Sequence, residues 1–512
     1  MNDSRTNNSI RNVFWSCSLN LSVVVFPFIL RSLFLKYIGE EILGITTLFT
    51  SIIQVLSITE LGISRAISAS LYIPVAEGNK EEICALLKQY KKIYRIVGVV
   101  ILSLGLIITP FLHLFMKNAD GITINYYVLW LAFLVSSCIG YFLYSYDISL
   151  LYANQREDIS RKVDLTLRVF EFALQFLVIV KYRSAILYVI IKGIHQIFYN
   201  VLCRLKCKKM YPDLEPNGVL NKKVKEELYE KVKALTILKL GSTLSNSVDA
   251  IFISSFIGLT AVTIYGNYMN VITAVTSFLA VACSALIASI GNSIVCTPKG
   301  KNYEDFVRLS YINAWVVGWC CVCFTCIFQS FMKCWVGDKL LFSMSIEILL
   351  VMRFYFERIR SIVSAYKDAL GLWQPDKWRP IIGGVVNIIL SYFLVINIGA
   401  SGVVIATIIS YVAIEIPWEN HTLFNHYFDE KEWEYYKVIF RVLVTMAIAG
   451  AVTYVVCDRI RMSDICEVVI KLLICTILPN LVFCILNIKN EYFAMSRRLL
   501  FKLAKSFVKI RK

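Results

Sequence analysis

The sequence predicts an all-α polytopic membrane protein with about fourteen transmembrane helices. Of its 512 residues, 57% are hydrophobic and only 17% are charged, and the mean hydropathy is +0.64. Soluble domains are typically about 45–50% apolar and about 25% charged, so most of this chain belongs in a bilayer. The formal net charge of +17 comes from basic residues clustered in short loops between apolar runs. That placement indicates membrane topology rather than a nucleic-acid-binding face.

Fourteen apolar windows account for most of the chain. A helix needs roughly 20 apolar residues to cross about 30 Å of hydrocarbon. The windows of that length begin near Val13, Ile42, Ile96, Tyr126, Val163, Ala185, Leu240, Val262, Leu309, Phe342, Ile381, Gly402, Val442 and Ile465. The first window follows a polar segment and lacks a small-residue cleavage site. We therefore expect a retained span there rather than a signal peptide.

Lysine and arginine predict the orientation of these spans. With the N-terminus inside, the inner segments hold 37 of the 53 basic residues and the outer loops hold eight. By the positive-inside rule, both termini of this multi-pass protein are expected in the cytoplasm. No outer loop exceeds about twelve residues, which leaves no room for an extracytoplasmic catalytic domain.

The sequence predicts no catalytic residue, metal site or cofactor. A phosphate-binding G-x-x-x-x-G-K-[ST] loop is missing, which argues against an ATP-driven pump. His421 and His426 are five residues apart in a polar inner segment and share a helix face poorly, so we interpret them as solvated. The run "CCVCFTC" (320–326) lies in an apolar window without a nearby histidine or carboxylate. Its cysteines are therefore expected to pack rather than to bind metal.

A faint internal repeat predicts two halves. An Ile-Gly turn occurs at Gly39 and again at Gly258, an offset of 219 residues, and the same offset aligns "YANQRED" (152–158) with "GLWQPDK" (371–377). Two coincident offsets suggest a duplicated six-helix unit. The predicted organisation is a six-helix bundle in 1–203, a basic cytoplasmic connector in 204–236, a second six-helix bundle in 237–420, and helices 13 and 14 with a basic tail in 421–512.

The segment "EILLVMRFYFERIRSIVSAYKDALGLW" (347–373) places charge inside an apolar run. Arg353, Glu357, Arg360, Ser364 and Lys367 follow at spacings of 4, 3, 4 and 3, which puts them on one face of one helix. An arginine at the centre of a spanning helix costs about 2.5–3.5 kcal/mol on insertion scales, so such a face usually points to a polar interior. Glu357 is expected to neutralise its two arginine neighbours in part. The alternative is a buried structural ladder of ion pairs.

Other predicted spans also carry polar side chains, and together they predict a hydrated, positively biased interior suited to an anionic polar substrate. The first two spans contain Arg31 and Arg65. Arg168 and Glu171 share a face of the fifth span with Asp164 and Gln175. The sixth and seventh spans contribute Lys192, Asn246 and Asp249. For Arg31 and Arg168, snorkelling to the membrane surface is an equal alternative.

Three segments resemble bacterial polysaccharide repeat-unit flippases of the Wzx type. They are "YIGEEILGITTLFTSIIQVLSITELGISRAISASLY" (37–72), "NSVDAIFISSFIG" (246–258) and "KDALGLWQPDKWRPIIGGVVNIILSYFLVINIGASGVVIATIIS" (367–410). The resemblance implies the multidrug/oligosaccharidyl-lipid/polysaccharide exporter fold, in which two six-helix bundles form a V. It also implies alternating-access transport of an undecaprenyl-pyrophosphate-linked oligosaccharide for O-antigen, capsule or exopolysaccharide synthesis. It matches no motif that assigns a role to a particular arginine.

The hypothesis that follows is a flippase and not an enzyme. Arg31, Arg65, Arg353 and Arg360 would attract the pyrophosphate, with Glu357 beside them. The lipid tail would stay in the bilayer against helices 13 and 14. An H⁺ or Na⁺ counter-ion would act through Asp249 or Glu357, and a polymerase and glycosyltransferases would be pathway partners. The alternatives are a cation-coupled multidrug antiporter of the same fold, a membrane glycan polymerase, and a scaffold for pathway enzymes.

Overall fold

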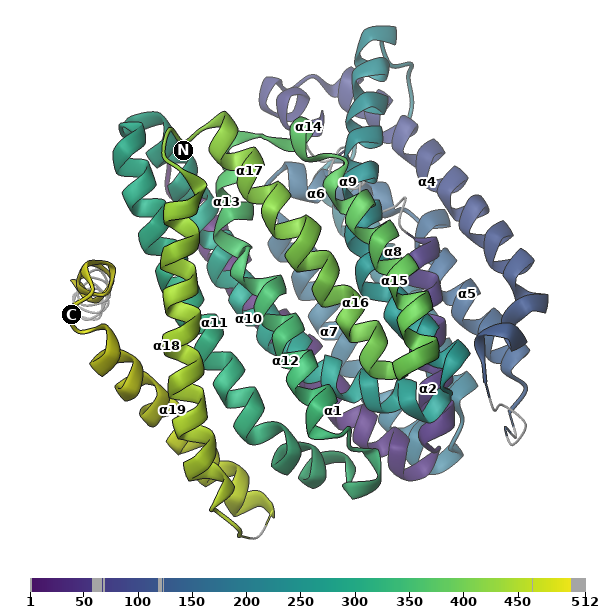
Figure 1. Cartoon of the computed structure of the whole chain (residues 1–512). Helices are drawn as coiled ribbons and strands as arrows, with labels where there is room; N and C mark the ends of the chain where they lie inside the picture. The colour runs from purple at the N-terminus through teal and green to yellow at the C-terminus, as the bar shows by residue number, and fades with distance from the viewer. Residues whose placement is uncertain are drawn as a thin grey trace. The chain divides into compact units, whose positions relative to one another are not determined.

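A computed structural model describes residues 2–57, 67, 70–117, 122, 124–462 and 464–498 of the chain. Within these residues every regular element is a helix (Figure 1). In a bilayer each backbone N–H and C=O must find its partner inside the protein, and a helix achieves this within a single segment. The predicted all-α class is confirmed.

The chain divides into two compact units, Met1–Gly266 and Asn267–Lys512. The first unit contains α1 (Asn2–Tyr37), α2 (Glu40–Leu56), α4 (Lys80–Ile108), α5 (Tyr126–Phe142), α6 (Ser145–Ala153), α7 (Glu157–Leu177), α8 (Ala185–Met210) and α9 (Lys222–Phe256). Two shorter helical segments, η1 (Thr109–Phe115) and η2 (Val178–Tyr182), extend α4 and α7. Helix α10 (Leu259–Cys296) begins in the first unit and continues into the second.

The second unit holds the remaining helices. They are α11 (Lys299–Val336), η3 (Asp338–Leu340), α12 (Met344–Ile359), α13 (Ser361–Leu370), α14 (Trp373–Asp376), α15 (Arg379–Ile398), α16 (Ala400–Ser410), η4 (Tyr411–Glu415), α17 (Ile416–His426), α18 (Glu432–Asp458) and α19 (Asp464–Asn487). In Figure 1, α15 and α16 run side by side as a helical hairpin.

Eight helices among the described residues are long and apolar enough to cross a membrane, and nine if the pair α5–α6, bent by 51°, is one span. The eight are Ser18–Tyr37, Lys80–Phe115, Ala185–Met210, Lys299–Val336, Trp373–Ile398, Ala400–His426, Glu432–Asp458 and Ile465–Asn487. Helices α2 and α12 have only 17 and 16 residues. The chain is thus a multi-pass membrane protein, and the number fourteen stays a prediction.

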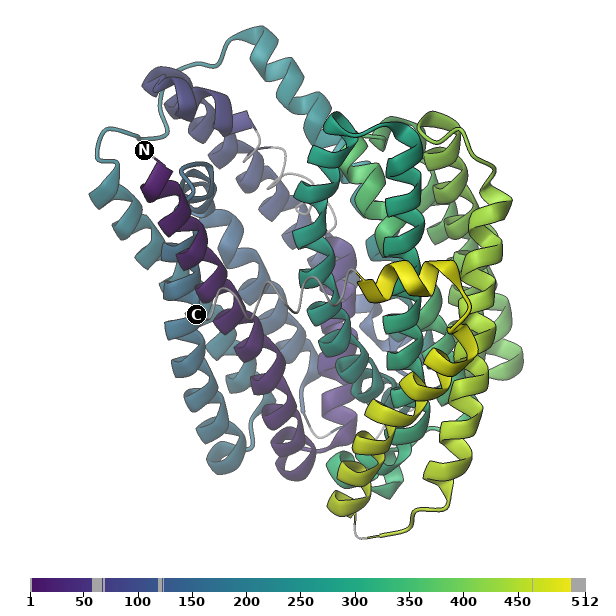
Figure 2. The ribbon, with the colours of Figure 1, turned by 90° about the vertical axis from the view of Figure 1, so that its left-hand side faces the viewer.

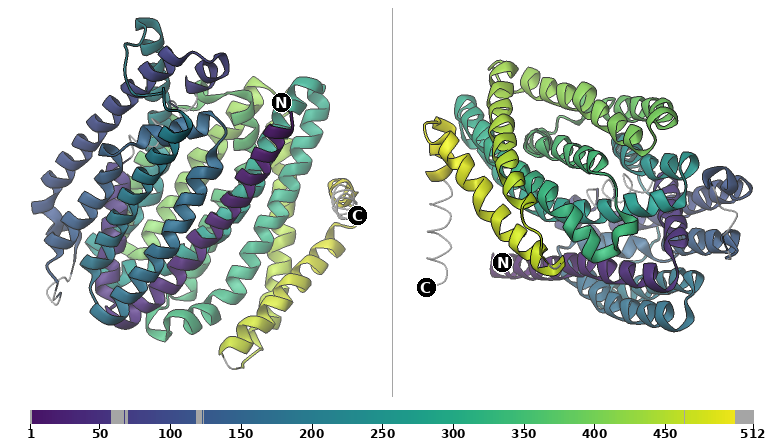
Figure 3. Two further views of the ribbon diagram at one scale, coloured as in Figure 1. Left: turned by 180° about the vertical axis from the view of Figure 1, so that it is seen from behind. Right: turned by 60° about the horizontal axis from the view of Figure 1, so that its bottom comes forward.

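Several helix pairs hold the first unit together. Helix α1, purple in Figure 3, packs along α7, while α5 packs on α8 and α2 on α9. The indole of Trp130 is fully buried in the shared apolar core beside Phe49. Its Nε1 donates a hydrogen bond to the Thr109 hydroxyl at 3.0 Å, so the one polar atom of this large side chain is satisfied.

Two glycine turns in the first unit both have positive φ and the same hydrogen-bond spacing. Gly39 separates α1 from α2 at φ 116°, and Gly258 separates α9 from α10 at φ 135°. The N–H of Gly39 donates to the carbonyl of Phe34, and that of Gly258 donates to the carbonyl of Ile253, both at 3.0 Å. Such positive φ values favour glycine. The internal repeat itself stays a prediction.

The two turns also pack on each other. A Cβ added to Gly44 of α2 would lie 2.3 Å from the carbonyl oxygen of Leu259 at the start of α10. The Thr263 hydroxyl donates to the carbonyl of Glu40. The backbones of the two turns therefore approach closely because position 44 lacks a side chain.

The loop between α8 and α9, residues 211–221, docks on α4. Lys80 Nζ lies 2.7 Å from Asp213 Oδ2, and this hydrogen bond lowers the pKa of the Asp213 carboxyl. Lys88 Nζ donates to the carbonyl of Gly218 at 2.9 Å. The predicted basic connector is therefore an extension of α8, a docked loop and the first turns of α9.

In the second unit, α11 is the central helix. Helices α12, α18 and α19 pack against it, with α18 and α19 in the yellow-green and yellow part of Figure 2. At one end of the unit, Phe306 contacts the rings of Tyr366, Phe424, Phe428 and Tyr435. Edge-to-face and tilted ring pairs of this kind stabilise beyond their buried area.

Large apolar side chains are exposed along the outer helices of the second unit. Phe393 on α15, Phe440 on α18 and Ile477 on α19 are each more than half exposed. In water such extensive apolar exposure would favour aggregation, whereas in a bilayer these side chains face lipid. This outward apolar surface agrees with the multi-pass assignment.

Candidate functional site

The ten residues that the sequence assigns to a polar interior are divided between the two units. Seven belong to the first unit and three, Arg353, Glu357 and Arg360, belong to the second. Arg65 lies outside the described residues, and so does the side chain of Asn246, whose backbone is part of α9.

Arg31 and Asp249 both bind the first turns of α10 within the first unit. Arg31 Nη2 donates to the carbonyl of Thr263 at 3.1 Å. Gly266 leaves room for this guanidinium, because a Cβ there would lie 2.6 Å from Arg31 Nη2. Asp249 is fully buried on α9 and accepts a hydrogen bond from the Tyr265 hydroxyl at 2.8 Å. Arg31 is therefore bonded within the first unit.

A polar cluster joins α7 to α8. Arg168 Nε lies 3.1 Å from Asp164 Oδ1, and Gln175 Nε2 donates to Glu171 Oε1 at 3.2 Å. The imidazole of His195 on α8 stands between the two acids, 3.3 Å from Asp164 and 3.9 Å from Glu171. The predicted face of the fifth span is thus one connected polar surface.

His195 is a member of this cluster that sequence reasoning missed. Its position gives a signal, because it follows the predicted Lys192 by three residues on the same helix. Lys192 itself lies over the ring of Tyr188, with Nζ 5.1 Å from the ring centroid. The ring contributes a cation–π contact to the lysine.

In the second unit, Arg353 is buried in the middle of α12. Its side chain is 1% exposed, and Nη1 lies 3.2 Å from the sulfur of Met269 at the start of the unit. Glu357 is half-buried one turn further along α12. Glu357 is predicted to neutralise both neighbouring arginines in part. For Arg360 this prediction is wrong, because Arg360 binds two other acids.

Arg360 stands at the junction of α12 and α13 and pairs with α17 and η4. Its Nε donates to Glu419 Oε2 at 2.8 Å, and its Nη2 lies 2.9 Å from Glu415 Oε2. The hydroxyl of Ser364, one turn along, donates to Glu419 Oε1 at 2.7 Å. Arg360 and Ser364, two residues of the predicted polar face, therefore both bind a single buried carboxylate.

The same network continues through α14 and α15. Lys367 Nζ lies 3.0 Å from Glu419 Oε1 and also pairs with Asp376. Arg379 binds Asp376 through two nitrogens, at 2.7 and 2.9 Å, and pairs with Glu415. The bidentate guanidinium–carboxylate geometry is the strong form of such a contact.

A π-helical turn positions the acids of this network. Segment η4 interrupts the long helix from Ala400 to His426, and Pro417 follows it in the first turn of α17. The Tyr411 ring lies 5.6 Å from the Arg360 guanidinium carbon, and Glu415 ends the same turn. Single π-helical turns occur often at functional sites. Here the turn presents one aromatic ring and one acid to the same cation.

The network, which we call the α12–α17 charge cluster, contains three cations and three acids. They are Arg360, Lys367, Arg379, Asp376, Glu415 and Glu419. Each side chain is at most 14% exposed. Their formal charges cancel, so this end of α12 is not the net cationic face that the sequence spacing predicts. The physical reason is that buried charge is stable only when paired.

The missed acids carry a signal in the sequence. Glu415 lies inside the apolar run of the predicted twelfth span, four residues before Glu419. An acid within an apolar run is itself a mark of a buried partner. Their cationic partners are 36 to 59 residues distant in the chain, which no local periodicity reveals.

Glu347, one turn into α12, is another buried acid of the second unit. It is fully buried, and no ion pair joins it within the described part of the chain. Burying a carboxyl without an ionic partner is costly.

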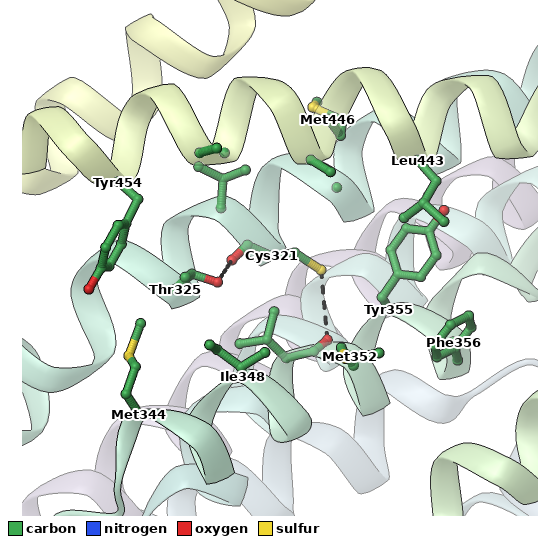
Figure 4. A pocket seen from close by; sticks show the side chains of 16 residues that line it. Cys321, Thr325, Met344, Ile348, Met352, Tyr355, Phe356, Leu443, Met446 and Tyr454 are labelled. Carbon is green, nitrogen blue, oxygen red and sulfur yellow. Dashed lines mark hydrogen bonds between the residues drawn. The ribbon is translucent and has the colours of Figure 1, made fainter. Parts of the chain in front are cut away.

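An apolar groove of about 490 Å³ lies between α11, α12 and α18 (Figure 4). Ile348, Met352 and Tyr355 line it from α12, and Met446 and Ala447 line it from α18. Thr325 on α11 donates its hydroxyl to the carbonyl of Cys321, so it offers no free donor to the groove. The groove is suited to an apolar chain.

Helix α12 carries two different faces. One residue along an α-helix turns by about 100°, so Arg353 and Glu357 point away from the groove face that Ile348, Met352 and Tyr355 form. One face is apolar and lines the groove, and the far side of the helix carries Arg353 and Glu357. An amphiphilic molecule has the same two parts.

Long apolar helices that enclose buried charge define the class of the chain, a polytopic membrane protein. The chain belongs to the polysaccharide biosynthesis protein family, whose model matches residues 9–289, more than half of its length. A comparison with curated protein sequences found no match.

Solved structures of two kinds share the fold. The lipid II flippase MurJ, in an inward closed conformation, has a TM-score of 0.64 at 15% identity over 93% of this chain and 99% of MurJ. An inward-facing multidrug resistance MATE family transporter of the MOP superfamily has a TM-score of 0.55 at 13% identity, over 82% of this chain and 98% of that protein. A mutant of the Vibrio cholerae MATE transporter VcmN has a TM-score of 0.54 at 15% identity, over 86% of this chain and 98% of that protein.

These likenesses confirm the predicted fold, and the family match agrees with the predicted relationship to polysaccharide biosynthesis. Both kinds of solved structure are transporters rather than enzymes. Identities this low assign no substrate to the chain.

Proposed function

We propose that this protein translocates an undecaprenyl-pyrophosphate-linked oligosaccharide across the bacterial inner membrane by alternating access. The product would serve O-antigen, capsule or exopolysaccharide synthesis. The single observation that carries the proposal is the two-faced helix α12 of a polysaccharide biosynthesis family member. Its groove face matches a polyprenyl tail, and its charged face matches a pyrophosphate.

Arg353 is the cation to which we assign the leading role in pyrophosphate attraction. Arg360 is engaged with two acids, so its part would be to hold the α12–α17 charge cluster in place. Arg31 and Arg65 would add positive potential from the first unit. A desolvated guanidinium attracts a phosphate strongly because the local dielectric is low.

The remaining predicted residues belong to coupling and to sugar solvation in this proposal. An H⁺ or Na⁺ ion would act through Asp249 or Glu357, and the buried Glu347 is a third candidate. Asn246, Glu171, Arg168 and Lys192 would supply hydrogen bonds to hydroxyl-rich sugars. Both termini would be cytoplasmic, and a polymerase and glycosyltransferases would act before and after translocation.

A multidrug antiporter is the second candidate, because two MATE transporters share the fold. Cationic drugs would favour an acidic site, whereas α12 carries a buried arginine. Loss of drug resistance on deletion, with surface polysaccharide unchanged, would support this candidate and contradict the flippase.

The groove offers a direct test. Ala447→Phe fills the groove from α18, so we expect it to block the lipid tail. In a deletion strain complemented with this variant, surface polysaccharide should fall at least about tenfold and lipid-linked repeat units should accumulate in the membrane. The measurement is quantitative lipid extraction together with surface polysaccharide staining.

Ile448→Phe is the matched control. Ile448 is the next residue on α18, lies outside the groove and is 46% exposed, so the same added ring faces lipid and transport should be retained. Equal activity of the two variants at equal membrane abundance would contradict the role of the groove. Normal surface polysaccharide in the deletion strain would contradict the flippase itself.

A further inference from the structure

Three buried cysteines from three helices of the second unit converge. Cys326 on α11, Cys457 on α18 and Cys475 on α19 are 6%, 1% and 0% exposed. Their sulfur atoms all lie within 4.8 Å of one another, and those of Cys457 and Cys475 are 3.9 Å apart. The group contains no histidine or carboxylate. Only one of its members belongs to the C-x-x-C-x-x-C run.

The sulfur spacing fits a shared metal ion. Zinc–thiolate bonds are about 2.3 Å long, so two thiolates on one such ion stand about 3.8–4.0 Å apart, in tetrahedral or trigonal geometry. A disulfide requires about 2.05 Å between two sulfurs and would leave the third thiol unused. The spacing of Cys457 and Cys475 therefore matches two ligands of one ion.

The surroundings of the cluster are asymmetric. Val322, Ile327 and Ile474 cover it with apolar surface. One helical turn away, at i+4 from Cys326 and at i−4 from Cys475, Ser330 and Lys471 form a polar layer in which Lys471 Nζ donates to the Ser330 hydroxyl at 2.8 Å. Lys471 Nζ also lies 2.7 Å from Glu467 Oε1, so this layer is polar and its charges are paired.

We propose that Cys326, Cys457 and Cys475 form a thiolate site for a soft d10 metal ion, Cu(I) or Zn(II), that fastens α18 and α19 to α11. Soft sulfur ligands select these ions. Three thiolates suffice for trigonal Cu(I). Zn(II) usually takes four ligands, and Cys323, whose sulfur lies 3.9 Å from the Cys475 carbonyl oxygen, is the adjacent fourth thiol. On binding, each ligand sulfur exchanges its S–H bond for an S–metal bond and releases one proton to solvent.

The site does not depend on the proposed transport function. It joins the two C-terminal helices to the central helix of the second unit, where α11, α18 and α19 already pack against one another. Its expected effect is on how firmly these helices are held, because an ion that binds only the folded state stabilises that state.

The test uses the full chain, purified in detergent under reducing, anaerobic conditions. One equivalent of Cu(I), buffered by a chromophoric chelator, is added in one arm and Zn(II) in a second, and metal content is measured after desalting. We expect about one retained ion per chain in at least one arm and a higher thermal unfolding midpoint. Cys326→Ser, Cys457→Ser and Cys475→Ser should each weaken the retained affinity at least about 100-fold.

Two control variants separate the site from other thiols. Cys321→Ser on α11 and Cys466→Ser on α19 keep the three ligands, so metal retention should be unchanged. The three ligand variants without metal should unfold at the same midpoint as the metal-free parent, which excludes misfolding as the cause. Unchanged retention in the triple serine variant would overturn the proposal, as would a Cys457–Cys475 disulfide trapped by alkylation of freshly isolated membranes.

Discussion

Glu419 is the residue on which the α12–α17 charge cluster depends most. It accepts hydrogen bonds from Arg360, Ser364 and Lys367 and is 1% exposed. Removing one partner of a buried ion pair leaves the other charge without compensation in a low dielectric, which typically costs about 3–5 kcal/mol. The attraction among the six buried charges offsets their desolvation cost only while all six are present.

We therefore predict that Glu419→Gln lowers the free energy of unfolding by about 3–5 kcal/mol. The amide keeps the shape but removes the charge. Thermal unfolding of the purified protein in detergent is the measurement. Glu434→Gln is the control, because Glu434 is 61% exposed and pairs with Lys437 at the surface, where a pair contributes little. Similar midpoints for both variants would contradict the assigned role of the cluster.

Arg353 carries a functional prediction at the same scale. Arg353→Ala should reduce complementation of the deletion strain at least about tenfold, because it removes the buried cation of the charged face of α12. Arg353→Lys keeps the charge and should retain part of the activity. Surface polysaccharide and membrane abundance are the two measurements. Full activity of the alanine variant would favour the scaffold alternative, in which buried charge has no role in transport.

At the scale of elements, small residues decide how closely two segments approach. Gly44 lets α2 meet the start of α10, where the Leu259 carbonyl oxygen would stand 2.3 Å from an added Cβ. A backbone atom cannot rotate away as a side chain can, so α2 itself would have to move. Overpacking of this kind typically costs about 1–3 kcal/mol.

We predict that Gly44→Ala lowers the thermal unfolding midpoint, whereas Gly300→Ala leaves it unchanged or raises it slightly. Position 300, in the first turn of α11, has nothing within 4 Å of an added Cβ. Both changes replace a helical glycine with alanine, so the intrinsic helix propensity gain is the same. An equal shift for the two variants would contradict the close approach of α2 to α10.

The elements also show where periodicity succeeds and where it stops. The 4-3-4 spacing correctly places Asp164, Arg168, Glu171 and Gln175 on one face of α7, because contacts on a single helix depend only on its 3.6-residue turn. The same reasoning places Arg360 on the correct face but does not find its partners. These are Glu415, which ends the π-helical turn η4, and Glu419 on α17, so both acids come from another part of the chain.

At the scale of the whole molecule, the distribution of basic residues predicts membrane orientation. Reporter fusions provide the test. A green fluorescent protein fused after Gly218, in the loop between α8 and α9, should fluoresce, and alkaline phosphatase fused after Gly337, between α11 and η3, should be active. Alkaline phosphatase fused after Gly218 should be inactive, and green fluorescent protein fused after Gly337 should not fluoresce. Active phosphatase at position 218 would reverse the predicted orientation and contradict cytoplasmic termini.

The sequence by itself determined the class of the protein, its all-α architecture, its family resemblance and the faces of single helices. These follow from composition and from local periodicity, which the chain carries in every short segment. Tertiary structure alone decided which charges meet. Glu415 and Glu419 neutralise Arg360, His195 joins Asp164 and Glu171, and three cysteines from α11, α18 and α19 converge. Such pairings depend on how helices distant in the chain pack, and no repeat in the sequence encodes that packing.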